Sequence, residues 1–322
     1  MAPVRAVLDG EAGEVAAVSR GGRRQPARSV LLAMLVSLAP QAMEAQRPLK
    51  VFISADMEGI AGVVTADQLG PSGFEYDRFR GFMTEEVLAA IQGARDAGAT
   101  TIVVADAHGN GQNLLIERFA DDVTVVRSWP RPLGMMQGID SSFAAAVFIG
   151  YHAGTTSTAG VRAHTLSSAT LTSLALNDIT VPEAGLSAAI AGHFGVPVVA
   201  ISGDDVAVAE AQALLGRIEG AVVKRAVSFH SAATMTPAAA RALIRARVKA
   251  GIERRGELRP YVLRAPVRLD VGFKHYRPGE LLSYLSIVER TGSHSIRFNG
   301  RDILEVSRFL EFMGDYSAEL TP

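Results

Sequence analysis

Val51-Phe-Ile-Ser-Ala-Asp56-Met-Glu58 is the stretch that decides the fold, because it brings two carboxylates to the end of a short apolar run. Two later stretches repeat the pattern, Ile102-Val-Val-Ala-Asp106-Ala-His108 and Ala146-Val-Phe-Ile-Gly-Tyr-His152. Apolar runs of this length, rich in β-branched and aromatic residues, are typical of strands buried on both faces of a parallel sheet. Ligands bind at the carboxyl ends of such strands. The three polar ends are therefore expected to converge on one crevice.

Carboxylates and imidazoles in one crevice suit zinc or a neighbouring divalent cation. The chain has no cysteine, so any metal must be held by His, Asp and Glu. Asp56 and Glu58 lie two apart just past a strand, and an extended backbone would point both to the same side. Each histidine also has a structural interpretation when taken singly. His108 could bond neighbouring backbone, whereas His152 lies among small residues that allow close backbone approach.

Composition limits the partners that the chain is expected to have. Its 322 residues are 48% hydrophobic, enough for a sizeable core, and 32 Lys and Arg face 33 Asp and Glu. This balance leaves no basic surface for nucleic acid or for an anionic membrane. We expect a small molecule or a short peptide as the partner, and no nucleic acid.

Alternating strand-like and helix-like patterns predict an α/β fold, with a mainly parallel sheet and flanking helices. The predicted strands and helices run in the order 49–55, 75–97 (helix), 100–105, 123–126, 145–150, 183–193 (helix), 196–202, 207–215 (helix) and 237–251 (helix). Short strands at 262–271 and 295–298 then precede a helix at 301–313. We predict a metal-binding catalytic domain over 47–225 and a smaller α+β portion over 226–322.

The first 46 residues have a different composition from the rest. Four arginines, at positions 20, 23, 24 and 28, precede the apolar run Val30–Ala39, and small residues follow at Ala42 and Ala45. This order resembles an export signal, and the apolar run is too short for a stable membrane span. We therefore expect a periplasmic or secreted protein. A disordered leader on a cytoplasmic enzyme is the alternative.

Four further acidic or histidine residues are weighed as candidates for the site. His164 lies in a stretch rich in Gly, Ser, Thr and Ala. This composition is typical of a mobile active-site loop, and a plain surface loop is the alternative. Glu183 begins a predicted helix after Pro182, where a carboxylate is favourable with or without a metal. Asp204-Asp205 follows a strand and is better explained as a helix N-cap than as a ligand.

Together these stretches resemble the zinc-dependent D-aminopeptidases of the dipeptide-transport-operon type. The resemblance runs from about Lys50 to the final helix, including Arg301-Asp302-Ile-Leu-Glu305, and it rests on six motifs in order. They are Ser54-Ala-Asp56-Met-Glu58-Gly-Ile-Ala-Gly62, Asp106-Ala-His108, Gly150-Tyr-His152-Ala, Gly160-Val-x-x-His164, Pro182-Glu183-x-Gly185 and Gly203-Asp-Asp205. Only the leader lies outside the resemblance. The loop between His152 and His164 departs from the family pattern, because it is about one residue longer.

The resemblance implies a centre with two zinc ions per chain. Asp56 is implied to bridge both ions, with Glu58 and His108 completing one site and with His152 and Glu183 completing the other. His164 is implied to be the catalytic group, as an acid/base or as a nucleophile. Five ligands with one shared leave positions open for water and substrate, as in catalytic sites.

These observations predict a zinc aminopeptidase that releases amino-terminal residues, with D-Ala peptides as the leading substrates. The resemblance also implies a homo-oligomer, such as a ring that encloses the active sites. Two alternatives remain open. One is another di-metal hydrolase on the same scaffold, an amidase or a phosphoesterase, since the same ligands serve both chemistries. The other is an exported peptide-binding protein.

Overall fold

The computed structural model describes Gly22 and residues 48–316. The expected export segment therefore lies outside the described residues, apart from Gly22. Residues 48–316 belong to one compact unit. None of the helices in the part of the chain that is described has both the length and the apolar character needed to cross a bilayer.

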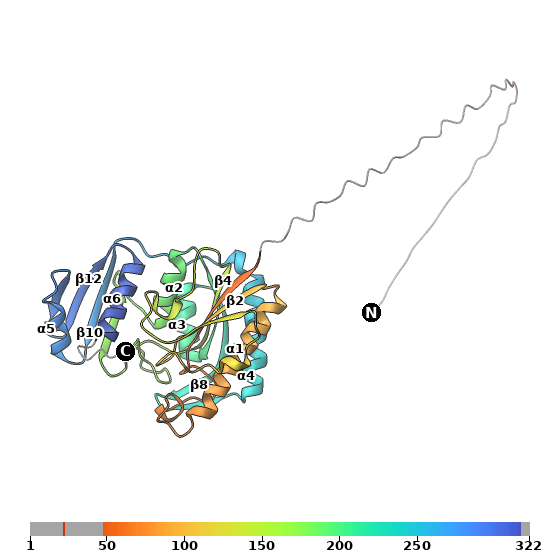
Figure 1. Cartoon of the computed structure of the whole chain (residues 1–322), viewed down its shortest axis with the longest axis horizontal. Helices are drawn as coiled ribbons and strands as arrows, with labels where there is room; N and C mark the ends of the chain where they lie inside the picture. Colours follow the sequence, from red (N-terminus) through yellow and green to blue (C-terminus); the bar gives the residue numbers. More distant parts are fainter. Residues whose placement is uncertain (1–21, 23–47, 317–322) are drawn as a thin grey trace, which may run out of the picture. The chain divides into compact units, whose positions relative to one another are not determined.

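A seven-stranded sheet forms the centre of this unit (Figure 1). All neighbouring strands in it are parallel except the last pair, β8 and β9. The strands follow the spatial order β3 (Val123–Val126), β2 (Thr101–Asp106), β1 (Lys50–Ala55), β4 (Ala145–Tyr151), β7 (Val198–Asp204), β8 (Glu219–Ser228) and β9 (Ser231–Thr234). The central strands are buried on both faces, which explains their unbroken apolar runs.

Alternate residues of β1 enter two different layers of the core. Val51 and Ile53 pack with α1 (Tyr76–Asp96) and α4 (Pro237–Glu253) on one face. Phe52 points the other way, into a cluster that contains α2 (Glu183–His193) and α3 (Asp205–Leu215). This two-residue period is what an extended strand imposes. The predicted α/β fold with a mainly parallel sheet and flanking helices is confirmed.

A second, five-stranded antiparallel sheet packs on the α2 side. Its order is β11 (Val288–Gly292), β12 (Ser295–Gly300), β10 (Val267–Phe273), β5 (Leu171–Leu176) and β6 (Ile179–Thr180). The helices α5 (Tyr276–Leu282) and α6 (Ile303–Asp315) complete this part of the unit. Phe298 and Phe309 stack at 4.2 Å between ring centres, joining β12 to α6. The domain boundary at 225 stays a prediction; that position lies within β8, and β5 and β6 contribute to the second sheet.

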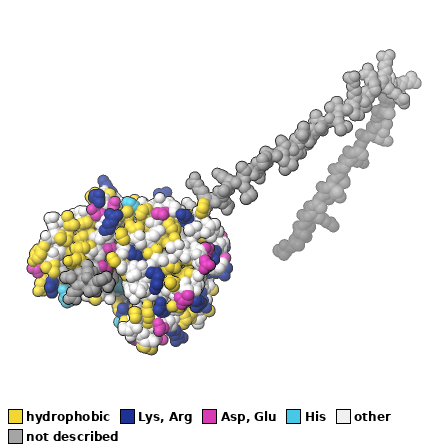
Figure 2. All heavy atoms as spheres, in the orientation of Figure 1, with side chains coloured by type: hydrophobic (Ala, Val, Ile, Leu, Met, Phe, Trp, Pro, Cys, Tyr) yellow, Lys and Arg dark blue, Asp and Glu magenta, His cyan; other side chains and the backbone are white. Residues whose placement is uncertain are grey.

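Within residues 48–316, four single-turn helices connect the main elements: η1 (Ala66–Gln68), η2 (Ile116–Arg118), η3 (Gly134–Met136) and η4 (Arg255–Glu257). On the face that Figure 2 shows, basic and acidic side chains of the described residues are interspersed. This mixture agrees with the net charge of −1. The fold thus places the carboxyl ends of β1, β2 and β4 side by side, and the predicted polar residues follow these ends.

Candidate metal centre

The end of β1 supplies two buried carboxylates. The Asp56 N–H donates to Ile149 O of β4 at 2.8 Å, which extends the sheet pairing by one residue past the strand. Asp56 and Glu58 are 2% and 5% exposed, so their charges are almost fully removed from water. Buried carboxylates require a positively charged partner. The structure supplies histidines on two sides.

His108 reaches the site from β2, the strand next to β1. Its Nε2–H donates to Leu69 O at 2.7 Å, which leaves Nδ1 facing the carboxylates, 3.2 Å from Asp56 Oδ1 and 2.9 Å from Glu58 Oε2. Asp106 stays out of the site, because it accepts hydrogen bonds from the N–H groups of Asn113 and Leu114 in the following turn. Asp106 therefore shapes the turn that presents His108.

His152 follows β4 and faces the other side of Asp56. Its Nδ1–H donates to Ala153 O at 3.0 Å, and its Nε2 lies 3.3 Å from both Asp56 Oδ2 and Glu183 Oε2. Two glycines allow this approach. A Cβ at Gly59 would lie 2.0 Å from Tyr151 O, and a Cβ at Gly150, where φ is +71°, would lie 2.2 Å from Asp56 O. The loops after β1 and β4 thus touch backbone to backbone, as the small residues around His152 predicted.

Glu183 is the first residue of α2 and is 5% exposed. Its position at a helix N-terminus stabilises the carboxylate, as expected from the sequence. One of its oxygens faces His152, and the other accepts a hydrogen bond from the Leu166 N–H at 2.8 Å. Glu183 therefore links the helix to the loop that carries His164.

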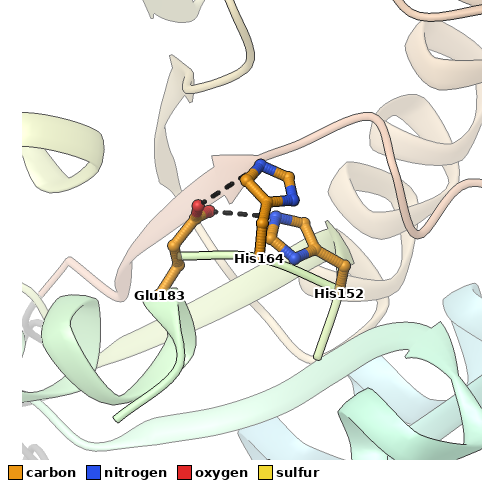
Figure 3. A group of neighbouring side chains, drawn as sticks. All are labelled: His152, His164 and Glu183. Atoms are coloured by element: carbon orange, nitrogen blue, oxygen red, sulfur yellow. Dashed lines mark ion pairs between the residues drawn. The ribbon is translucent and has the colours of Figure 1, made fainter. Parts of the chain in front are cut away.

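His164 stacks on His152, with ring centres 4.0 Å apart and planes 7° apart (Figure 3). Its Nδ1–H donates to Arg162 O at 2.7 Å, and Arg162 has the left-handed φ of +54° that turns this carbonyl toward the ring. The other nitrogen, Nε2, lies 3.9 Å from one oxygen of Glu58 and 3.9 Å from one oxygen of Glu183. His164 is thus centred between the two sides of the site.

Six of the predicted residues therefore form two neighbouring groups of donors. In each group the ligand atoms lie within 4.8 Å of one another; the first group is Asp56, Glu58 and His108, and the second group is His152, His164 and Glu183. All three histidines bind a backbone carbonyl through one nitrogen and face carboxylates with the other. Histidines that bind metals are oriented in this way in proteins.

The site fits divalent ions better than it fits a network of hydrogen bonds. Among the described residues, Asp56 Oδ2, Glu58 Oε2 and His152 Nε2 are buried and make no hydrogen bond, although each lies close to a group of opposite charge. Buried polar atoms are rarely left without a partner in proteins. His108 Nδ1 and Asp56 Oδ1 lie within hydrogen-bonding distance, at 3.2 Å, but these three buried atoms do not find such a partner in the described part of the chain. Nitrogen and oxygen atoms grouped in this way suit zinc and its neighbours.

Burial disfavours the charged form of five side chains in the site, yet opposite charges prevail for four. Glu58 and Asp56 raise the pKa of His108 well above its ordinary value, and Glu183 and Asp56 do the same for the pKa of His152. These histidines lower the pKa of Glu58 and of Glu183 in return. Burial and the charge of Glu58 raise the pKa of Asp56. The carboxylates thus demand positive charge, which protons supply here and divalent ions would replace.

Both groups open into a cavity of about 780 Å³. Its far wall is apolar and comes from α2, the second sheet, α5 and α6, through side chains that include Leu186, Phe273, Leu282 and Leu310. A cavity of this size accommodates a small organic ligand or a short peptide.

Two polar residues near the site are Asp204, which the sequence analysis considered, and Lys224, which it did not. Asp204 is the N-cap of α3, as predicted, since one oxygen accepts from the Ala207 N–H at 2.7 Å. Its second oxygen accepts from the Val161 N–H at 2.7 Å and so anchors the loop that leads to His164. Lys224 was not singled out from the sequence. Its place in the apolar stretch Ala221-Val-Val-Lys224 is the signal that could have identified it.

Comparison with known proteins agrees with this geometry. The family model of the D-aminopeptidases matches residues 49–312. A D-aminopeptidase of Bacillus subtilis is 32% identical over 260 residues, which cover 80% of this chain and 93% of that protein. The solved structure of the Zn-dependent D-aminopeptidase DppA from Bacillus subtilis, described as a self-compartmentalizing protease, has a TM-score of 0.80 at 28% identity and covers 85% of this chain and 99% of its own. The predicted family is thereby confirmed: the chain belongs to the D-aminopeptidases of peptidase family M55.

Proposed function

We propose that the chain is a zinc-dependent D-aminopeptidase with two ions per chain. The observation that carries the proposal is the position of Asp56. One of its oxygens faces His108 of the first group and the other faces His152 of the second. Asp56 would bridge the ions, with Glu58 and His108 completing one site and with His152 and Glu183 completing the other.

When bound, a pair of zinc ions supplies a Lewis acid for the scissile carbonyl and acidifies the attacking water. The protein supplies binding and proton transfer. Strand ends and a helix start hold the four remaining ligands, so their positions are fixed before substrate arrives. These ligands are Glu58, His108, His152 and Glu183. The cavity beside them holds the peptide and limits access of bulk water.

His164 is the group that moves the proton in this proposal. Because Nδ1–H is held by Arg162 O, Nε2 is the nitrogen that can accept a proton and return it to the leaving amine. Its side chain is 13% exposed, against 9% for His108 and 1% for His152. His164 is therefore the most accessible of the three histidines to substrate.

Short peptides with an amino-terminal D-amino acid, such as D-Ala, are the proposed substrates, because the relatives are D-aminopeptidases. The solved relative is self-compartmentalizing, which supports a homo-oligomer for this chain, such as a ring that encloses the sites. Light scattering coupled to gel filtration tests this assembly; a monomer would contradict it.

We also propose that the protein is exported, on the basis of the basic and apolar leader over residues 1–46. In the periplasm such an enzyme could trim peptides released from the cell wall. Cell fractionation tests this proposal. Recovery of the full-length chain in the cytoplasmic fraction alone would overturn it.

The direct test of the activity is hydrolysis of matched D-Ala and L-Ala dipeptides by the chain that starts at Gln46. The protein is assayed after chelation and again after zinc is restored. We expect zinc to restore cleavage of the D substrate only. No cleavage of either substrate by a chain that carries two ions would favour an amidase or a phosphoesterase instead. A chain that binds no metal would overturn the site itself.

A further inference from the structure

Lys224 is a lysine of β8 that is only 2% exposed, and its ammonium group is fully occupied (β8 in Figure 1). Nζ donates to three backbone carbonyls of one loop, those of Glu58, Ile60 (3.1 Å) and Val63 (2.6 Å). An ammonium has three hydrogens, so each donor has an acceptor. The loop that receives all three begins at Glu58, a member of the first group.

The same loop, residues 58–63, is held at its N–H groups by three other elements. The Gly59 N–H donates to Gly150 O at 2.7 Å, the Ala61 N–H to Glu86 Oε1 at 3.0 Å and the Gly62 N–H to Thr234 Oγ1 at 2.8 Å. Each of these contacts fixes one point. Lys224 fixes three points and is the contact that reaches the carbonyl of Glu58 itself.

An apolar residue at this position could not bind the three carbonyls of the loop. Burying an ammonium is unfavourable unless it is fully hydrogen-bonded, and the charges of nearby carboxylates, that of Asp204 first, favour the charged form of this one. Removing the ammonium would take one donor from each of the three carbonyls, of which that of Ile60 keeps a bond from the Val63 N–H at 3.2 Å, and would release the loop from β8. The side chain of Glu58 would then lose its fixed direction toward His108.

We propose that Lys224 is a positioning residue for the first group, which orients Glu58 and thereby tunes the affinity of the zinc ion that Glu58 and His108 hold. This inference rests on the proposed function, since it requires zinc at the site. Lys224 touches neither substrate nor ion and acts only through the backbone of Glu58 and the loop that follows it.

The test compares Lys224→Met and Lys224→Gln with the parent chain, and uses Lys249→Met as the control. Methionine keeps the length of the side chain and removes every donor, whereas glutamine keeps two donor hydrogens. Lys249 is a partly exposed lysine of α4 that pairs with Glu253. Zinc affinities are measured by chelator competition, and circular dichroism of the metal-free chains confirms that each variant is folded.

We expect one of the two zinc ions to be held about 10–100-fold less tightly in Lys224→Met, as for other residues that orient metal ligands. Lys224→Gln should lie between this variant and the parent, and Lys249→Met should match the parent. Should Lys224→Met not fold, the comparison of Lys224→Gln with the parent decides.

Parent affinity for both ions in every folded variant, even with lowered thermal stability, would overturn the inference and assign Lys224 a structural role alone. A parent chain that binds no zinc would instead overturn the proposed function. The two failures are therefore distinguishable.

Discussion

The two groups of donors are built in different ways. The first group comes from the ends of two adjacent strands, β1 and β2, whose register pairs Ala55 with Asp106 and so sets its geometry within the central sheet. The second group combines a strand end, a helix start and a loop with left-handed residues at positions 162 and 166. Sheet register gives a fixed place for an ion, whereas the loop adds a histidine that substrate can reach. Asp56 thus joins a half whose place is set by sheet register to a half that is completed by a loop.

Asp56→Ala should have the largest effect, because Asp56 is the residue that both groups share. We expect loss of both ions and a fall in activity of about 1,000-fold or more, since metal charge is worth several kcal/mol and 1.4 kcal/mol corresponds to a factor of ten. Metal analysis and peptidase assays measure both effects. Asp140→Ala, which alters an exposed turn, is the control. Retention of two tightly bound ions would show that Asp56 does not join the groups.

His164→Ala should separate catalysis from metal binding. We expect kcat to fall by about 100–10,000-fold, the range for general acid–base groups, with zinc content and KM little changed. His193→Ala, at the exposed end of α2, should match the parent. Loss of an ion together with activity would show that His164 is a metal ligand. The second group would then lack a histidine that is free to act on substrate.

Glu86 holds the loop that follows Glu58, and its contribution to the free energy of unfolding is expected to depend on pH. Burial raises its pKa from 4.5 to about 7, so the folded chain keeps a proton that the unfolded chain releases. This stabilising contribution is complete below about pH 4.5 and is lost as the pH rises through 7. The shift corresponds to at most about 3 kcal/mol.

Glu86→Gln should therefore lose less stability than the parent between pH 5 and 8, by up to about 3 kcal/mol. Urea unfolding of the metal-free chains across this range measures the difference. The exposed Glu289→Gln should follow the parent. Parallel curves for Glu86→Gln and the parent would show that Glu86 does not titrate in this window.

Gly59→Ala addresses the contact between the two halves, and its expected effect is the smallest. The added methyl group would meet Tyr151 O at 2.0 Å, so the loops after β1 and β4 must separate. We expect a loss of about 1–3 kcal/mol in the free energy of unfolding and weaker zinc binding. Gly81→Ala in α1, where nothing lies within 4 Å, should be neutral or slightly stabilising. Equal behaviour of the two variants would exclude a tight junction.

Five strands of the central sheet, β3, β2, β1, β4 and β7, could be predicted because their signals are local. The helix predicted over 75–97 is observed as Tyr76–Asp96, and the one predicted over 183–193 has those bounds in the structure. The final helix starts at Ile303 instead of 301, because Asp302 is its N-cap and accepts from the Glu305 N–H. Buried parallel strands and capped helices carry their pattern within about ten residues, so the sequence reveals them.

The second sheet could be predicted only in part, because its pairing is not local. Leu171–Leu176 was not expected to be a strand, and its partner is β10, where Leu174 faces Val271. β6 and β11 of this sheet were also missed, and so were β8 and β9 at the edge of the central sheet. Most positions of β6, β9 and β11 are exposed, and only three of the ten positions of β8 are buried. Strand formation at such positions depends on tertiary neighbours.

The candidate site divides in the same way. Convergence of Asp56, Glu58 and His108 follows from adjacent parallel strands. The joining of His164 to Glu183 depends on loop contacts that no local pattern encodes. Both residues were candidates from the sequence, but their roles came only from the resemblance to the family. Lys224 was missed because its acceptors belong to a loop more than 160 positions earlier in the chain.

The most direct test of the account is a stepwise zinc titration of the metal-free chain, with D-Ala dipeptide hydrolysis followed at each addition. The account predicts that activity reaches its plateau at two zinc ions per chain, because both groups of donors must be filled around Asp56. A plateau at one ion per chain, with no further binding, would contradict it.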